Sequence, residues 1–429
     1  MTPKKETFCI VPFTMLYSMN NGDYRACCHS EPGFPIDSDP NIPANFFNDS
    51  FEEVWNNNYY RQLRLDLING VRNKTCATCW KLEANNEYSF RNKYNLNEKR
   101  EEVIQFYTTE TLRNKGKISW TPKSIQIKMG NLCNLKCMMC NQASSNLIEK
   151  EINEWKEKNI VVPKWLSWVD KHEIDWTGID ENTNFEILYK NLRSGLIKVE
   201  QIQLVGGEPL VNPITPLLLE RLIEERVAKN IRIYFISNLT SLTDKMVNLL
   251  SQFKESVISV SWDHVDPEKF KYIRFPANYH HFEKNVDKLL DIKNIDPKIS
   301  TTFNIFNIFD VPEIFDKFES ISQSRGKEYT VNFQYVENPN YLSVRYLDED
   351  QKSILISSIN KYLAHTKDYK IWKENPATYN QLLSIENMLS KPLNDFEETV
   401  KERTRVLKLY DQTRHTDYKS LFPFIRDYD

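Results

Sequence analysis

The sequence has few glycines and no long apolar run. Only ten of its 429 residues are glycine, which excludes a glycine-rich linker or a low-complexity polymer. No stretch of about 18 uncharged apolar residues occurs, so we expect no membrane span. No apolar segment follows the first lysines, so we expect no signal peptide and a cytoplasmic location. In a reducing cytoplasm, clustered cysteines serve as metal ligands or catalytic groups more often than they form disulfides.

Charge of one sign is also lacking. The chain has 56 Lys and Arg against 59 Asp and Glu, for a net charge of −3. This balance gives no electrostatic reason to expect nucleic acid as a partner. Forty per cent of the residues are hydrophobic, so a large core is possible, and the length favours two or three packed units.

The eight cysteines all lie in the first third of the chain, and three of them are closely spaced. Cys133, Cys137 and Cys140 form a C-x3-C-x2-C pattern. Three thiolates in one tight loop can bind three irons of a cubane and leave the fourth without a protein ligand. An open coordination position is where a substrate or cofactor can bind. The alternatives are a zinc loop with a remote fourth ligand and a chance cluster.

A strand pattern runs directly into this loop, and strand and helix patterns alternate after it. This alternation predicts a parallel sheet with crossover helices. A helical pattern around 213–227 follows the second predicted strand. Six such units suit a partial (β/α)6 barrel, an α/β fold whose functional loops lie at the carboxyl ends of the strands. The predicted strands are 124–129, 200–205, 231–237, 257–261, 299–304 and 329–334.

The cysteine loop and the motifs after the strands resemble the radical SAM superfamily. Gly206-Gly207-Glu208-Pro209 is similar to the GGEP segment of that family, and Ser261-Trp262-Asp263 to its Ser-x-Asp. The resemblance implies a [4Fe–4S] cluster on Cys133, Cys137 and Cys140 that reductively cleaves S-adenosylmethionine (SAM). The resulting 5′-deoxyadenosyl radical then abstracts a hydrogen atom from the substrate.

The same resemblance implies which residues contact SAM. The glycines let the backbone approach the ligand closely, and Glu208 is suited to pair with the SAM ammonium. Plain structural roles remain open for several of them, such as a helix cap for Asn238 or Asp263 and a solvated surface for Arg274. No catalytic side chain is assigned. The implied SAM contacts are Met139, Gly206, Gly207, Glu208, Pro209, Asn238, Ser261, Asp263 and Arg274.

The N-terminal cysteines resemble a second, auxiliary site. Cys9, then Gly22 and Cys27, match the first half of a SPASM motif, and Cys76-x-x-Cys79 its later pair. The resemblance implies a shortened, twitch-type domain with a four-cysteine [4Fe–4S] cluster, here placed before the barrel by circular permutation. A turn at Gly22-Asp23 and a helical stretch over 51–67 would bring the cysteines together. Structural zinc, redox-regulatory thiols and Cys28 in place of Cys27 remain alternatives.

These patterns predict three parts and one reaction class. We expect an auxiliary domain over 1–110, a radical SAM barrel over 120–340 and a helical C-terminal extension over 341–429. The segment 336–339 would line the substrate mouth. The expected substrate is a peptide or protein side chain, with a flavodoxin- or ferredoxin-type reductant. A radical SAM dehydrogenase of a small molecule, a non-catalytic iron–sulfur electron carrier and a zinc-stabilised binding module are the rival functions.

Overall fold

The fold was determined as a computed structural model, which describes residues 3, 6–30, 35–84, 89–97, 101–167, 181–326 and 328–428. It is a mixed α/β fold with a mostly parallel sheet of eight strands, in the order β10-β9-β8-β7-β6-β5-β1-β2. All six strands predicted from the sequence form, with small shifts at their ends. These are β5 (Ser124–Lys128), β6 (Gln201–Val205), β7 (Arg232–Ser237), β8 (Glu255–Ser261), β9 (Ile295–Phe303) and β10 (Thr330–Tyr335).

The chain divides into two compact units, each described by itself. Unit 1 comprises residues 1–131, 169–235 and 245–256, and unit 2 comprises residues 132–168, 236–244 and 257–429. The division of the sequence into an auxiliary domain, a barrel and an extension stays a prediction. None of the helices within the described residues combines the length and apolar character needed to cross a bilayer.

In unit 1 the N-terminal segment joins the parallel sheet, which the sequence patterns did not indicate. Strand β1 (Met15–Ser18) forms a hairpin with β2 (Tyr24–Arg25), and the turn contains Gly22 at φ +83°. The other edge of β1 pairs in parallel with β5, so that Met15 lies opposite Ser124. Strand β5 in turn pairs with β6 over its whole length. The carboxyl ends of β5 and β6 therefore lie side by side.

The predicted helix over 51–67 is two helices, α2 (Phe51–Trp55) and α3 (Asn58–Asn69). The break occurs because Asn57 adopts an extended conformation and its side chain accepts the Tyr60 N–H as an N-cap. The other helices of unit 1 are α1 (Val11–Thr14), α4 (Ala77–Ala84), α5 (Phe90–Asn97), α6 (Glu101–Arg113), α8 (Glu181–Leu196), α9 (Ile214–Glu224) and α10 (Asp244–Leu250, whose first residue belongs to unit 2). A small hairpin pairs β3 (Pro35–Ile36) with β4 (Asp39–Pro43).

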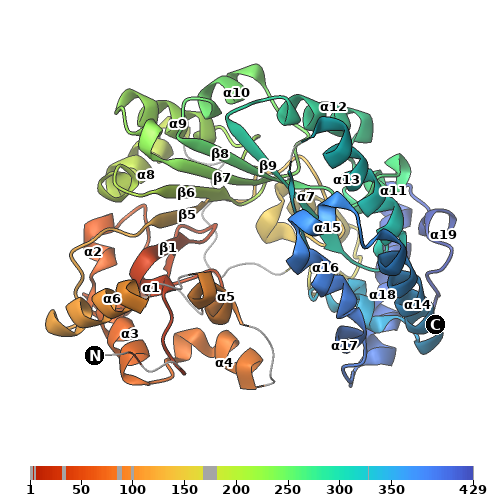
Figure 1. The fold of residues 1–429 in the computed structure, drawn as a ribbon, viewed down its shortest axis with the longest axis horizontal. Helices are drawn as coiled ribbons and strands as arrows, with labels where there is room; N and C mark the ends of the chain where they lie inside the picture. Colours follow the sequence, from red (N-terminus) through yellow and green to blue (C-terminus); the bar gives the residue numbers. More distant parts are fainter. Residues whose placement is uncertain are drawn as a thin grey trace. The chain divides into compact units, whose positions relative to one another are not determined.

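Unit 2 follows the alternation expected of barrel strands and their covering helices. Burial alternates along β9, which pairs in parallel with β10. Helix α12 packs against β9 (Figure 1). Helix α16 packs against β10. The predicted helical extension forms as a series of helices. The helices of unit 2 are α7 (Asn146–Glu157), α11 (Pro267–Ile273), α12 (Tyr279–Leu290), α13 (Val311–Arg325), α14 (Glu349–Thr366), α15 (Lys370–Glu374), α16 (Pro376–Leu383), α17 (Ile385–Leu389), α18 (Phe396–Arg414) and α19 (Tyr418–Leu421).

A buried arginine joins three segments of unit 1. The Arg64 guanidinium of α3 donates to the carbonyl oxygens of Pro12 and Trp55, at 2.9 and 2.8 Å, and to that of Gly116 at 3.4 Å. Its carbon Cζ lies 4.6 and 4.5 Å from the ring centres of Trp55 and Tyr60. Burial lowers the pKa of Arg64 to about 9, so the group is still charged at neutral pH. The carbonyl dipoles and the two rings compensate this buried charge.

We expect Arg64→Met to destabilise unit 1 by about 3 kcal/mol, because it leaves buried carbonyl groups without a donor. Arg61→Met is the matched control, since Arg61 lies on the same helix, is only partly buried and donates to one carbonyl, that of Lys115. It should cost less than about 1 kcal/mol. Urea unfolding followed by tryptophan fluorescence measures both variants. Equal losses in the two would contradict the role given to Arg64.

Candidate functional site

The cysteine loop of unit 2 is held in place mainly through its backbone. The Lys136 N–H donates to the Phe275 carbonyl at 2.6 Å, and the Met138 N–H donates to the Ile273 carbonyl at 2.9 Å. Ser145, the N-cap of α7, donates its hydroxyl to the Leu135 carbonyl at 2.7 Å. The residues between the three cysteines are therefore fixed from two sides, by the end of α11 and by the start of α7.

Two side chains place N–H donors beside the sulfur atoms of the loop. Asn238 Nδ2 lies 3.9 Å from Cys133 Sγ, and Arg274 Nη1 lies 3.9 Å from Cys137 Sγ. Asn238 also donates to Asn134 Oδ1 at 3.0 Å. Hydrogen bonds and positive charge at cysteine sulfurs stabilise thiolates, which are the form that binds iron.

Arg274 is oriented by a buried ion pair. Its Nη2 lies 2.7 Å from Asp263 Oδ2, and the two side chains are 9% and 0% exposed. The other carboxylate oxygen of Asp263 accepts the Thr302 N–H at 2.7 Å. Arg274 Nε has no hydrogen-bond partner among the described residues. The structure therefore uses Asp263 to hold Arg274, and it leaves one buried donor of Arg274 available for a ligand.

The thiols of the loop are electrostatically coupled. A hydrogen bond with Cys140 and the nearby Arg274 charge lower the pKa of Cys137, although burial opposes this shift. The same hydrogen bond and burial raise the pKa of Cys140. The hydrogen bond between the two thiols therefore favours the thiolate of Cys137 and disfavours that of Cys140.

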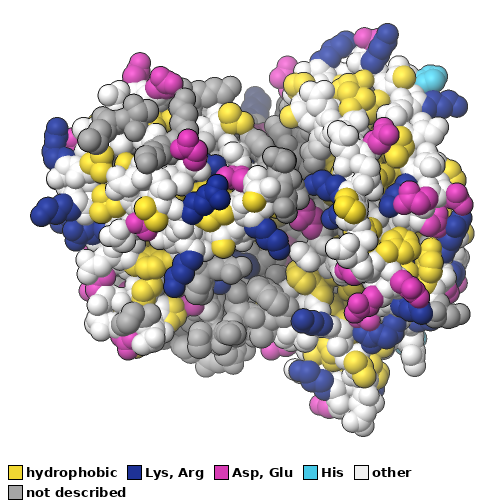
Figure 2. Space-filling model, turned by 90° about the horizontal axis from the view of Figure 1, so that it is seen from below, with side chains coloured by type: hydrophobic (Ala, Val, Ile, Leu, Met, Phe, Trp, Pro, Cys, Tyr) yellow, Lys and Arg dark blue, Asp and Glu magenta, His cyan; other side chains and the backbone are white. Residues whose placement is uncertain are grey.

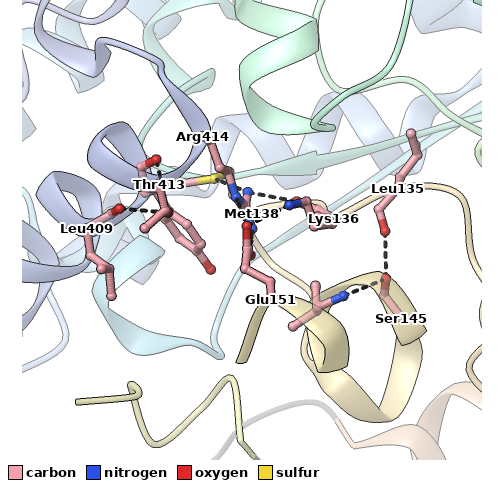
Figure 3. Close-up of polar contacts among 10 residues, drawn as sticks. Leu135, Lys136, Met138, Ser145, Glu151, Leu409, Thr413 and Arg414 are labelled. Carbon is pink, nitrogen blue, oxygen red and sulfur yellow. Dashed lines mark hydrogen bonds and ion pairs between the residues drawn. The ribbon is translucent and has the colours of Figure 1, made fainter. Parts of the chain in front are cut away.

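A further residue at this loop, Arg414 at the end of α18, was not among the predicted site residues. Its Nη1 donates to the Lys136 carbonyl at 2.9 Å, and its Nη2 lies 2.7 Å from Glu151 Oε2 (Figure 3). Arg414 Nη1 also lies 3.5 Å from Met138 Sδ. More than 270 residues separate Arg414 from the loop in sequence, and no local pattern encodes such a pairing.

In unit 1 the GGEP segment follows β6 beside the end of β5. The Gly207 N–H donates to the Gly130 carbonyl at 3.0 Å, and Asn212 Nδ2 donates to the Met129 carbonyl at 2.7 Å. Gly206 has φ +136°, and a Cβ there would lie 2.8 Å from the Gly130 oxygen and 2.9 Å from the Met129 nitrogen. Only glycine fits this close approach of two backbones.

The other residues expected to contact SAM lie at the end of a strand, just after a strand or in the cysteine loop. Glu208 is buried, and its Oε1 accepts the Leu210 N–H at 3.0 Å. Pro209 follows it, Ser261 is the last residue of β8, and Met139 in the cysteine loop is half-buried. Contact of each of these residues with SAM stays a prediction.

Cys9, the first of the N-terminal cysteines in unit 1, lies in a segment that several hydrogen bonds hold in place. Arg91 and Asn95 both donate to the Phe8 carbonyl, at 2.9 and 2.7 Å, and the Ile10 N–H donates to Asn95 Oδ1 at 2.9 Å. Cys9 is therefore fixed by hydrogen bonds on both sides. At the C-x-x-C turn, Trp80 Nε1 donates to the Asn73 carbonyl at 2.8 Å, which anchors the helix that contains Cys79.

The four predicted auxiliary ligands lie within electrostatic range of one another. Burial raises the pKa of Cys9 well above its usual value, and negative charge on Cys27, Cys76 and Cys79 raises it further. Burial also raises the pKa of Cys27 to about 11 and that of Cys76 to about 12. Thiolates that repel one another in a buried site are stabilised when a metal cation binds, so this set fits a metal or cluster. Cys28 is exposed, which favours Cys27 as the ligand.

One further group of metal-type side chains is already satisfied. His264, Asp310 and Glu313 have potential ligand atoms within 4.8 Å of one another. Lys269 Nζ lies 2.8 Å from Asp310 Oδ2, and His264 Nε2 lies 2.9 Å from the same oxygen. His264 Nδ1 accepts the Asp266 N–H. These contacts account for the group without a metal ion.

A groove of about 670 Å³ in unit 2 lies between α18 and the segment after β10. Asn338 and Pro339, from the segment 336–339, line it; the role of this segment at a substrate mouth stays a prediction. Trp165 forms part of another side, next to Leu166, whose carbonyl accepts the Gln142 N–H at 3.1 Å. One side of the groove is thus tied to a residue just beyond Cys140.

Comparisons with known proteins agree with this geometry. The family model of the radical SAM superfamily matches residues 127–318, and that of an iron–sulfur cluster-binding SPASM domain matches residues 9–80. A probable GTP 3′,8-cyclase from Methanocaldococcus jannaschii is 23% identical over 205 residues, which cover 47% of this chain and 57% of the cyclase. This chain therefore matches less than two thirds of that relative.

Two solved structures share low similarity with the chain. Streptococcus suis SuiB is 15% identical, with 76% of this chain and 66% of that chain covered and a TM-score of 0.36. The enzyme anSMEcpe, solved with bound SAM, is 16% identical, with 57% and 61% covered and a TM-score of 0.36. The two family models carry the assignment: the chain belongs to the radical SAM superfamily of enzymes, in the subgroup with a SPASM- or twitch-type iron–sulfur domain.

Proposed function

We propose that the protein cleaves SAM reductively at a [4Fe–4S] cluster held by Cys133, Cys137 and Cys140 and removes hydrogen from a peptide or protein side chain. The observation that carries this proposal is the pair of N–H donors, Asn238 and Arg274, each 3.9 Å from a cysteine sulfur of the loop. Hydrogen bonds to the sulfur atoms are one of the features by which a protein tunes an iron–sulfur cluster. When bound, the reduced cluster supplies the electron for SAM cleavage.

The residues around Arg274 support binding of the methionyl carboxylate of SAM. Arg274 is positively charged and buried, and its Nε has no partner among the described residues. Asp263 holds the guanidinium in one orientation, so the free donor points in a fixed direction. Arg274 would bind the carboxylate, and Asn238 would orient the loop at Cys133.

The GGEP segment would bind the ammonium group of SAM. Glu208 is a buried acid at the carboxyl end of β6, where ligands of parallel α/β folds bind. Its Oε1 is engaged with the Leu210 N–H, which fixes the carboxylate in one orientation. Gly206 and Gly207 lie against the backbone of Met129 and Gly130, which places this turn at the carboxyl ends of β5 and β6.

We further propose that Cys9, Cys27, Cys76 and Cys79 hold an auxiliary [4Fe–4S] cluster. The four neighbouring thiols described above, whose thiolate forms would repel one another, support a multiply charged cationic group there. Zinc is the alternative occupant, because four cysteines with one C-x-x-C also suit it. The auxiliary cluster would take an electron from the substrate radical that hydrogen abstraction leaves, and a flavodoxin- or ferredoxin-type protein would reduce the catalytic cluster.

The groove of unit 2 is the proposed substrate site. It is lined by basic side chains such as Lys164 and Arg405 and by acidic ones such as Glu398, together with Asn338 and Asn340. Amide, basic and acidic side chains together suit a polypeptide segment, because its backbone and side chains present both hydrogen-bond donors and acceptors. On the face shown in Figure 2, the described basic and acidic side chains are interspersed and do not gather by sign. This mixture does not favour a polyanionic partner.

The decisive test is SAM cleavage in the anaerobically reconstituted, reduced protein. Wild type should bind about eight irons and form 5′-deoxyadenosine, because two cubanes are present. A variant with Cys133, Cys137 and Cys140 changed to Ala should bind about four irons and form none. Iron analysis and chromatography of the products measure both. A full iron complement in wild type without SAM cleavage would favour an electron carrier.

The auxiliary ligand assignment predicts different results for two neighbouring cysteines. Cys27→Ser should lower the iron content by up to about four per chain, because it removes one of four ligands. Cys28→Ser, the exposed neighbour, should keep the full iron content. Zinc analysis on the same samples distinguishes the alternative metal. Loss of iron in Cys28→Ser but not in Cys27→Ser would reverse the assignment.

Gly206→Ala should disrupt the GGEP segment, because its Cβ would collide with the backbone of Gly130 and Met129. We expect a loss of stability of about 2 kcal/mol and at least about tenfold weaker SAM binding. Gly326→Ala is the control, since its φ of +61° is also positive but no atom lies within 4 Å of the new Cβ. Thermal unfolding and equilibrium dialysis with SAM compare the two. Unchanged SAM affinity in Gly206→Ala would remove this segment from the SAM site.

A further inference from the structure

The C-terminal helix α18 reaches the cysteine loop through one side chain. Arg414 is the last residue of α18, and its side chain is 2% exposed. Two of its nitrogens contact the Glu151 carboxylate, at 2.7 and 3.1 Å, and a third group, Nη1, donates to the Lys136 carbonyl (Figure 3). Lys136 lies between two of the proposed cluster ligands, Cys133 and Cys137.

The contacts of Arg414 form a closed network of three charges. Lys136 Nζ lies 2.7 Å from Glu151 Oε1, so the single carboxylate of Glu151 serves both cations. Burial alone would raise the pKa of Glu151, but Arg414 and Lys136 lower it, so the acid stays ionised. Two cations and one anion leave a net charge of +1 beside the loop. The Arg414 Cζ also lies 3.9 Å from the ring centre of Tyr410.

The contacts of Arg414 indicate a role at the cluster more than a role in stabilising α18. Another arginine of the same helix, Arg403, is equally buried and donates to the Tyr346 carbonyl at 3.0 Å. Arg403 therefore anchors the helix to the segment after β10 without contact to the loop. Arg414 differs because its partners are a loop carbonyl, the Met138 sulfur and an acid that also binds Lys136.

We propose that Arg414 is a positioning residue of the catalytic cluster, which ties α18 to the loop backbone and raises the cluster's reduction potential through its buried charge. The proposal rests on the proposed function of the cysteine loop. A cluster gains negative charge on reduction, so a net positive charge nearby stabilises the reduced form. Hydrogen bonding at Lys136 also fixes the spacing between Cys133 and Cys137.

An EPR-monitored redox titration of the full, reconstituted protein tests this proposal. The signal of the catalytic cluster is the one that changes when SAM is added. Arg414→Met should lower the equilibrium constant for one-electron reduction of the cluster about tenfold. This corresponds to a reduction potential lower by about 59 mV. Arg414→Lys keeps the charge and should restore the potential. Glu151→Gln removes the compensating anion and should shift the potential in the opposite direction, upward.

Arg403→Met is the matched control for buried arginines of α18. It should lower the melting temperature but leave the potential and the EPR spectrum unchanged. An unchanged potential in Arg414→Met, or an equal shift in Arg403→Met, would overturn the proposed role of Arg414 but would leave the proposed function untouched. Absence of any SAM-responsive signal in wild type would overturn the proposed function, and this role with it.

Discussion

The buried ion pair between Asp263 and Arg274 is the interaction on which the geometry of the cysteine loop depends. It fixes a three-residue segment that contributes to the loop in three ways. Ile273 and Phe275 accept backbone N–H groups of the loop, and Arg274 places its guanidinium at Cys137. A buried carboxylate without its arginine would be strongly unfavourable, so the pair exists only when the segment is in place. Backbone position and thiol charge are thereby controlled together.

Such a loop needs support from several directions, because it contains no regular secondary structure. Ser145 supports it from the start of α7, and Arg414 supports it from the end of α18. These contacts come from segments far apart in sequence, so the loop is complete only when unit 2 is folded. This dependence suits a site that must position a reactive group, since supporting residues outside the ligand set usually determine how well a metal centre works.

Much of this arrangement followed from local sequence, and the parts that did not have a physical reason. The spacing of Cys133, Cys137 and Cys140 is a local property, and strand periodicity is also local, so both could be predicted. The break between α2 and α3 depends on the capping choice of Asn57, which the apolar pattern does not report. The pairing of β1 with β5 and the contact of Arg414 with Lys136 depend on tertiary packing. In the sequence alone, an arginine such as Arg414 cannot be distinguished from an ordinary surface arginine, because its partners are distant in the chain.

The position of β1 has a consequence for how the chain is made. One edge of β1 is covered at once by β2, but its other edge waits for β5, on the order of a hundred residues later. All four proposed auxiliary ligands leave the ribosome before β5 does. A metal or cluster bound there would close the loops of the N-terminal segment before its sheet partner exists. Cofactor delivery would then precede completion of the parallel sheet, while one edge of β1 is still open.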